Sequence, residues 1–156
     1  MIFSVLKLIH VLAVVLWVGG MAFAHFFLRP SVQALDPPVR LRLLHAVMQR
    51  FFSAVLLASL AVLVSGVWMI GRVAKQTVQA GQVFEMPLAW SIMATLGIVM
   101  IAIFGHIRFA LFKRLSRAVD TDDWPVAGAA MASIRIWVFA NLCIGIAVLC
   151  VTTLMG

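Results

Sequence analysis

The sequence predicts an all-α integral membrane protein, a four-helix transmembrane bundle with both termini extracytoplasmic. The chain has 156 residues, of which 65% are hydrophobic and 11% are charged. Its mean hydropathy is +1.15, whereas a soluble domain carries about 25% charged residues. Four apolar stretches, about residues 2–28, 51–70, 88–112 and 133–155, each reach the ~20 residues that cross a bilayer core as a helix. We expect one membrane domain over residues 1–156.

The first two helices have recognisable boundaries. Proline disfavours a helical residue before it, so Arg29-Pro30 is expected to end the first helix. Asp36 followed by Pro37 is typical of an N-cap and a first-turn proline. The second helix is therefore predicted to begin near Pro37, well before it enters the membrane.

The remaining connections follow the same logic. Residues 71–87 include two glycines and a proline, and they are predicted to form the second loop. Residues 120–125, with the sequence DTDDWP, repeat the helix-start signal. The fourth helix is therefore predicted to start near Trp124 and to project from the bilayer.

Lysine and arginine define the expected orientation, because cytoplasmic connections are enriched in these residues. The first and third connections, with their helix ends, hold nine of them: Arg29, Arg40, Arg42, Arg50, Arg108, Lys113, Arg114, Arg117 and Arg135. The other side holds three: Lys7, Arg72 and Lys75. This places the first and third connections in the cytoplasm. The formal net charge of +7 is thus assigned to topology, and no nucleic-acid partner is expected.

Histidines within the spans are candidate functional residues, because ionisable groups are costly in the membrane and imidazole binds haem iron, copper and zinc. By helix rise, His10 lies ~8 Å outside the midplane, and His106 and His25 lie ~10 and ~14 Å on the cytoplasmic side. His25 and His106 are level enough to share a metal. Met93, ~9 Å outside the midplane, is the best partner for His10. His45 lies at the bilayer edge.

Helix periodicity predicts which faces point inward. His10, Trp17 and Met21 share a face of the first helix, and Trp17 is too deep for an interfacial belt. Small and polar residues predict two further inward faces. These are Thr95, Val99, Ala102 and His106 on the third helix, and Asn141, Gly145, Val148 and Thr152 on the fourth. Met86, Met93 and Met100 form a separate stripe, interpreted as packing or as part of a copper path.

Two interpretations stay open for the polar residues. The histidines either ligate a metal or form hydrogen bonds between helices. Arg29, Arg50 and Arg108 either mark topology and contact headgroups, or hold haem propionates through bidentate hydrogen bonds.

The stretch LKLIHVLAVVLWVGGMAF, residues 6–23, has a histidine followed seven residues later by a tryptophan and then by small residues. These are His10, Trp17, Gly19 and Gly20. The pattern resembles the first helix of the CopD-like (copper resistance protein D) family, which is related to HemJ-type protoporphyrinogen oxidases. The segments LRPSVQALDPPVRLRLL, RFFSAVLLASLAVLVSGVWMI, LGIVMIAIFGH and FKRLSRAVDTDDWPVAGAAMASI resemble its small standalone members, so the resemblance covers nearly the whole chain.

The resemblance implies a four-helix protein of the bacterial inner membrane that handles copper or binds haem b. In the HemJ branch the first-helix histidine is associated with haem, which here would be His10. Family members often carry a histidine where this chain has Ser91. HemJ proteins carry a lysine shortly after it, where this chain has Ile92, Met93 and Ala94.

Three functions follow as hypotheses. The first is a haem b protein for electron transfer or quinone-linked redox chemistry, with His10, His25 and His106 as metal ligands and with Trp17 and Met93 also in the cofactor site. An enzyme of this kind would be a haem-dependent oxidoreductase. The second is copper binding or uptake, for which soft sulfur ligands suit Cu(I). The available sulfur ligands are Met21, Met93, Met100, Cys143 and Cys150. The third is an accessory subunit of a larger membrane complex, or a homo-oligomer, in which the histidines are structural.

Overall fold

The computed structural model describes residues 2–154, and this part of the chain contains four rods of helix. The first rod joins α1 (Ile2–Phe23), the π-helical turn η1 (Ala24–Leu28) and α2 (Arg29–Ser31); the second is α3 (Pro37–Gln79). The third joins α4 (Leu88–His106), the π-helical turn η2 (Ile107–Leu111) and α5 (Phe112–Asp120); the fourth is α6 (Trp124–Leu154). All four are long and apolar enough to cross a membrane. The predicted multi-pass membrane protein is confirmed.

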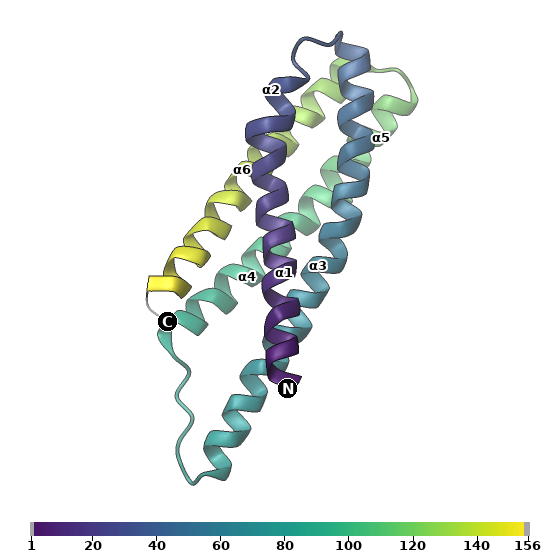
Figure 1. Ribbon diagram of the computed structural model, residues 1–156. Coiled ribbons are helices and arrows are strands. Elements are labelled where there is room, and N and C mark those ends of the chain that lie inside the picture. Colours follow the sequence, from purple (N-terminus) through teal and green to yellow (C-terminus); the bar gives the residue numbers. More distant parts are fainter. Residues whose placement is uncertain (1, 155–156) are drawn as a thin grey trace.

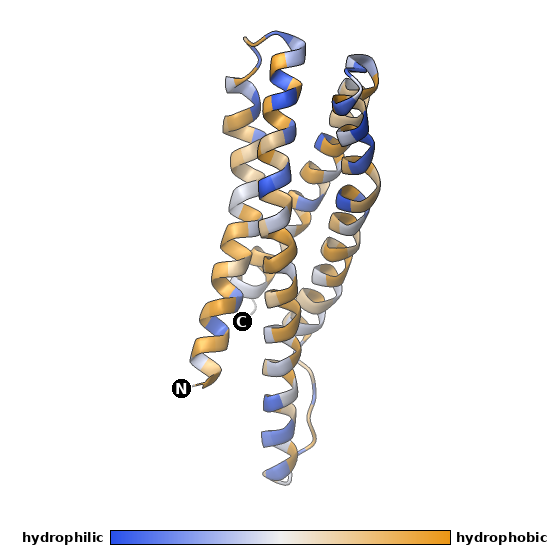
Figure 2. Cartoon of the chain, turned by 90° about the vertical axis from the view of Figure 1, so that its right-hand side faces the viewer, coloured by the Kyte–Doolittle hydropathy of each residue, from blue (hydrophilic) through white to orange (hydrophobic). Residues whose placement is uncertain are grey.

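The rods form an elongated bundle of two helix pairs. α1 packs mainly on α3, and α4 packs mainly on α6, which α5 also contacts. Both ends of the described chain lie at one end of the bundle (Figure 1). The two short connections before α3 and α6 lie at the opposite end, which we call the connection end. The hydropathy colouring in Figure 2 shows apolar residues along all the rods, as expected for helices surrounded by lipid.

Both predicted helix starts are confirmed, at Pro37 and at Trp124. Asp36 occupies the N-cap position of α3 but makes no side-chain capping hydrogen bond. Asp123 does cap α6, since its Oδ1 accepts a hydrogen bond of 3.2 Å from the backbone N–H of Val126. The capping oxygen satisfies one of the backbone donors that a helix start leaves without an intrahelical partner.

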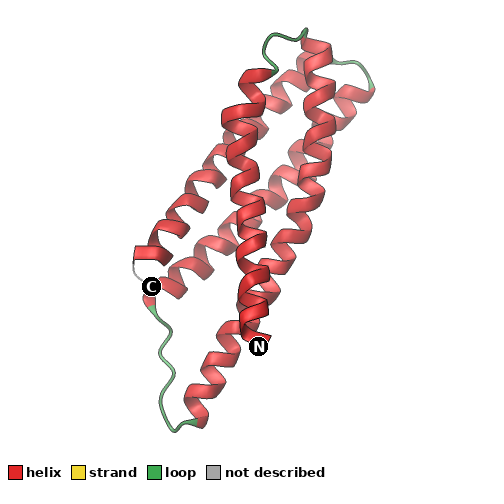
Figure 3. Cartoon of the chain, in the orientation of Figure 1, coloured by secondary structure: helices red, strands yellow, loops and turns green. Residues whose placement is uncertain are grey.

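The predicted loop over residues 71–87 is wrong in its first half. α3 runs on to Gln79, so the connection is much shorter (Figure 3). A single glycine costs a helix only about 1 kcal/mol, and Gly71 is tolerated within α3. The helix is terminated instead by Gly81, which lies just beyond its last residue and whose φ of +76° is the left-handed conformation that ends helices.

The predicted end of the first helix at Arg29-Pro30 is also corrected. The rod continues to Ser31 because η1 widens the helix just before the proline. The backbone N–H of Arg29 donates to the carbonyl of Ala24, five residues back. This π-helical register replaces the α-helical one at the place where the proline ring would otherwise break it.

The two halves of the chain share a plan. Each has a helix with a π-helical turn near the connection end, a short connection, and a long returning helix. His10 lies fourteen residues before the first π-helical turn, and Met93 lies fourteen residues before the second. His10 and Met93 therefore occupy equivalent positions in the two halves.

An aromatic cluster joins the two pairs in the core. The ring of Phe104 on α4 makes edge contacts with Trp17 on α1, at 5.9 Å between centroids, and with Phe52 on α3, at 6.0 Å. Phe52 also meets Phe112 on α5 at 5.3 Å. Such edge pairs contribute about 0.5–1.5 kcal/mol each beyond area burial. In lipid, where apolar burial gives little, this packing holds the bundle together.

Two glycines allow close approach in this core. A Cβ at Gly20 would collide with the ring of Phe51, and a Cβ at Gly145 would lie 2.9 Å from a methyl group of Val18. The predicted inward faces of the first and fourth helices are confirmed: Trp17 and Met21 are 4% and 2% exposed, and Asn141, Gly145, Val148 and Thr152 are buried or half-buried.

The predicted inward face of the third helix is wrong. Thr95, Val99, Ala102 and His106 are all exposed on the outside of the bundle. The core face of this rod instead carries Met100, Phe104 and Ile107. Large side chains fill the space between the pairs, and of the methionine stripe only Met100 is buried there, whereas Met93 is half-buried and Met86 is exposed.

Candidate functional site

His10 is held against α3 by one hydrogen bond in the half of the bundle that holds the termini. Its Nδ1 lies 2.9 Å from Oγ of Ser65, a residue that is only 1% exposed. The His10 ring itself is half-buried. The predicted interhelical contact of this histidine is therefore present, and it joins the first helix pair.

The two contacts of the Ser65 hydroxyl favour one tautomer of the imidazole. The hydroxyl of Ser65 donates its hydrogen to the backbone carbonyl of Ala61, one turn earlier in α3. Its oxygen is then free to accept, so Nδ1–H of His10 is the donor. The proton on Nδ1 leaves the lone pair on Nε2. A metal-ligating histidine has this arrangement, in which one ring nitrogen is anchored by a hydrogen bond and the other is available.

The space around the ring is set by a glycine. A Cβ built on Gly66 would lie 3.4 Å from Cε1 of His10, so the imidazole lies close against the α3 backbone. Met69 follows Ser65 by four residues and shares its face of α3. Met93, the predicted partner, is half-buried on α4 in the other pair. We take these two thioethers as the candidate sulfur partners of His10.

His45 makes a second hydrogen bond of the same kind near the connection end. Its Nε2 lies 2.9 Å from Oγ of Ser116, whose hydroxyl donates to the carbonyl of Phe112. The imidazole also stacks on the Phe112 ring at 5.1 Å between centroids. His45 thus ties α3 to α5, and its free nitrogen is Nδ1.

His25 and His106 lie level with each other but on different sides of α6. His25 stacks on Phe139 at 4.7 Å, and His106 makes an edge contact with Trp137 at 5.3 Å. Residues 137 and 139 are about 200° apart around a helix of 3.6 residues per turn. The structure therefore does not bring these two histidines together, although they were predicted to be level enough to share a metal.

The three predicted arginines lie on three different elements, α2, α3 and η2. Arg29 lines a cavity at the connection end together with His25. Arg50 is exposed on α3. Arg108 lies in η2, with its guanidinium 5.4 Å from the centre of the Phe112 ring, and its buried Nε has no hydrogen-bond partner within residues 2–154. The described residues contain no cluster of three or more histidine, cysteine or acidic side chains suited to a metal ion.

The sulfur candidates divide between core and surface. Cys143 and Cys150 are free thiols exposed on the outer side of α6. Met21 and Met100 are buried in the aromatic core. Sequence reasoning had not singled out Ser65 or Met69. Their signal was a serine inside an apolar run with a methionine one turn later.

A model of the copper resistance protein D (CopD) family matches residues 45–155, which is most of the chain. The chain belongs to the CopD family. The match covers α4 to α6 and most of α3, including Ser65 and Met69, whereas His10 and the rest of α1 lie outside it. No curated protein and no solved structure matched the chain.

Proposed function

We propose that this CopD-family membrane protein binds Cu(I) through Nε2 of His10. The observation that carries the proposal is the hydrogen bond between His10 and Ser65, because it favours the tautomer with the proton on Nδ1 and the lone pair on Nε2. Imidazole suits copper, and Cu(I) also favours thioether sulfur. Met69 and Met93 are the proposed sulfur ligands.

The expected topology indicates the side of the membrane from which copper would reach this site. With the arginine-rich connection end in the cytoplasm, both termini face outward, and His10 lies in the outer half of the membrane. A copper ion would then reach His10 from outside the cytoplasm. A role in moving copper into or across the bundle follows, in a multi-pass protein of the bacterial inner membrane.

Haem b at His10 is the second candidate, because the same Nε2 could ligate haem iron. The proposed arginine partners weigh against it. Arg29 follows His10 by nineteen residues, about 28 Å along a helix, nearly the thickness of the hydrocarbon core. A haem bound to His10 would therefore not reach Arg29. Electron transfer, with or without a quinone, would depend on that haem.

The accessory-subunit hypothesis keeps one supporting observation. His106 is exposed on the outer side of α4, and a polar side chain facing lipid is costly unless another helix covers it. Native mass spectrometry of the protein from mild detergent tests this hypothesis; a strictly monomeric protein with no bound subunit would count against it.

Anaerobic titration of the purified protein with Cu(I), in competition with a coloured chelator, tests the main proposal. The expected result is one Cu(I) per chain, lost in His10→Ala and retained in His106→Ala. An absorption spectrum of protein from haem-replete cells tests the second candidate. A Soret band that disappears in His10→Ala, with no Cu(I) binding by the wild type, would replace copper by haem.

A further inference from the structure

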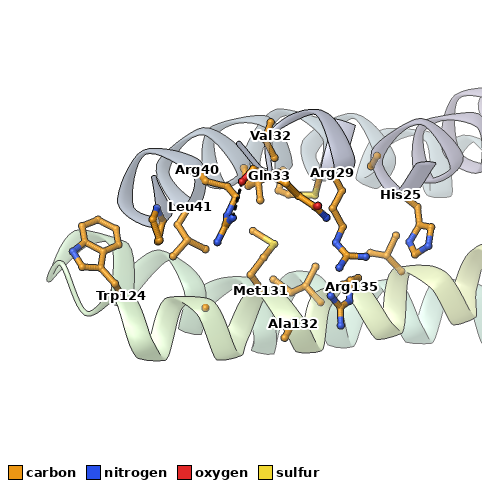
Figure 4. Close-up of a pocket in the computed structure, with 17 residues that line it drawn as sticks. His25, Arg29, Val32, Gln33, Arg40, Leu41, Trp124, Met131, Ala132 and Arg135 are labelled. Carbon is orange, nitrogen blue, oxygen red and sulfur yellow. Dashed lines mark hydrogen bonds between the residues drawn. The ribbon is translucent and has the colours of Figure 1, made fainter. Parts of the chain in front are cut away.

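A cavity of about 500 Å³ lies at the connection end, between the end of the first rod, the start of α3 and the first turns of α6. Its polar side chains are mostly cationic: Arg29, Arg40 and Arg135, with His25 and Gln33. Figure 4 shows Arg29 and Arg135 reaching toward each other from opposite walls. The residues that line this cavity include no aspartate or glutamate.

The arginines of the cavity lack a counter-ion within the described chain. The salt bridge found among residues 2–154 joins Arg42 to Asp122, both outside the cavity. Arg40 makes only a long hydrogen bond of 3.4 Å, from Nη1 to the carbonyl of Gln33. Facing guanidinium groups repel each other, more strongly in a medium of low dielectric constant than in water. The arrangement therefore calls for an anion between Arg29 and Arg135.

The other walls of the cavity are apolar. They are formed by Leu41, Leu44, Met48, Met131, Ile134 and Val138. Trp124 stands at the end nearest the connection. A ligand that fits both the arginines and these walls has an anionic head and an apolar tail.

We propose that this cavity binds an anionic phospholipid, with its phosphate between Arg29 and Arg135 and an acyl chain along the apolar wall. Guanidinium groups bind phosphate oxygens in bidentate geometry, and basic pockets between transmembrane helices recognise anionic headgroups. His25 serves as wall rather than ligand, since its ring is covered by Phe139 on one side and Phe26 on another. This lipid site is independent of the copper site proposed at His10.

The test measures lipid binding by the full chain in neutral detergent, followed by tryptophan fluorescence and by the thermal unfolding temperature. The probes are dioctanoyl phosphatidylglycerol, dioctanoyl phosphatidylcholine and inorganic phosphate. We expect saturable binding of phosphatidylglycerol that the other two do not match. Arg29→Gln and Arg135→Gln should each weaken it by about tenfold or more, the loss expected for one hydrogen bond between charged groups.

Arg114→Gln is the matched control, because it removes an exposed arginine of α5 outside the cavity and should leave the affinity within about twofold, as a solvent-exposed charge contributes little. Arg135→Lys keeps the charge but not the bidentate geometry, and should give an intermediate affinity. Without lipid, Arg135→Gln should unfold at or above the wild-type temperature, because one of two repelling charges is gone. Cu(I) binding should be unchanged in all of these variants, which separates this proposal from the one on His10.

Three results would overturn the proposal. Equal binding of phosphatidylcholine would mean that only the apolar wall matters. Equal binding of inorganic phosphate would mean a free-anion site. Haem binding that Arg135→Gln abolishes, with phosphatidylglycerol affinity unaffected by that substitution, would assign the cavity to a porphyrin.

Discussion

Two histidines of this chain make nearly the same contact. His10 bonds to Ser65, and His45 bonds to Ser116, both at 2.9 Å. In each pair the serine hydroxyl donates a hydrogen bond to a backbone carbonyl one turn earlier in its own helix. Judged by these two contacts alone, both histidines would fall into one class of interhelical hydrogen bond.

Their surroundings separate them. His45 stacks on Phe112 near the connection end, so packing as well as the hydrogen bond accounts for it. His10 has no aromatic ring stacked on it among the described residues, and it lies within the apolar span. The His10 imidazole, with one nitrogen anchored and the other available, is suited to bind a metal. The stacked imidazole of His45 is suited to hold two helices together.

Replacing each histidine by alanine should give the largest difference between the two sites. His10→Ala should lower Cu(I) affinity by more than about a hundredfold, because losing a ligand costs more than losing its orienting partner. His45→Ala should leave the Cu(I) affinity within about twofold, because His45 is neither a proposed ligand nor the orienting partner of one. Competition titration of both purified variants checks the pair. An equal loss in the two would remove the distinction drawn between them.

Removing each serine tests orientation. Ser65→Ala should weaken Cu(I) binding about 10- to 100-fold, the usual cost of losing a hydrogen bond that orients a ligand. Ser116→Ala should not change it. The same titration applies, and unchanged binding in Ser65→Ala would show that the hydrogen bond does not prepare Nε2.

Filling the space beside His10 tests the geometry. Gly66→Val adds a side chain at the position whose Cβ would already lie 3.4 Å from Cε1 of His10. Overpacking of this kind costs 1–3 kcal/mol, so Cu(I) affinity should fall by about tenfold. Gly71→Val is the control on the same helix, since a Cβ there meets nothing within 4 Å. Equal effects would point to general damage to α3.

The smallest effect concerns stability. Ser116→Ala removes the partner of His45, and hydrogen bonds between membrane helices average about 0.6 kcal/mol. Equilibrium unfolding in mixed micelles should show a loss of that size. A loss several times larger would mean that His45 and Ser116 hold α5 in place, beyond a single hydrogen bond.

Much of the fold could be predicted from the sequence, because it depends on local signals. Apolar length predicted the four spans, and the aspartate and proline signals predicted where α3 and α6 begin. The π-helical turns were missed, since a widened turn depends on the packing of its neighbours as well as on Pro30. The loop was predicted to begin at Gly71, but one glycine does not end a long helix.

The candidate site could be predicted only in part. The position of His10 on an inward face follows from periodicity, but its contact with Ser65 depends on how α1 and α3 are offset along each other. Serines in apolar helices commonly bond to their own backbone, and this one also accepts from another helix. The small residues beside His106 were interpreted as a packing surface within the chain, whereas here large side chains fill the core.

X-ray absorption at the copper edge, on wild-type protein loaded with one equivalent of Cu(I), tests the central claim most directly. We predict a coordination shell with one imidazole and at least one sulfur, in which the imidazole contribution disappears in His10→Ala and persists in His45→Ala. A shell of sulfur alone, or an imidazole contribution that survives in His10→Ala, would contradict the assignment of His10 as the copper ligand.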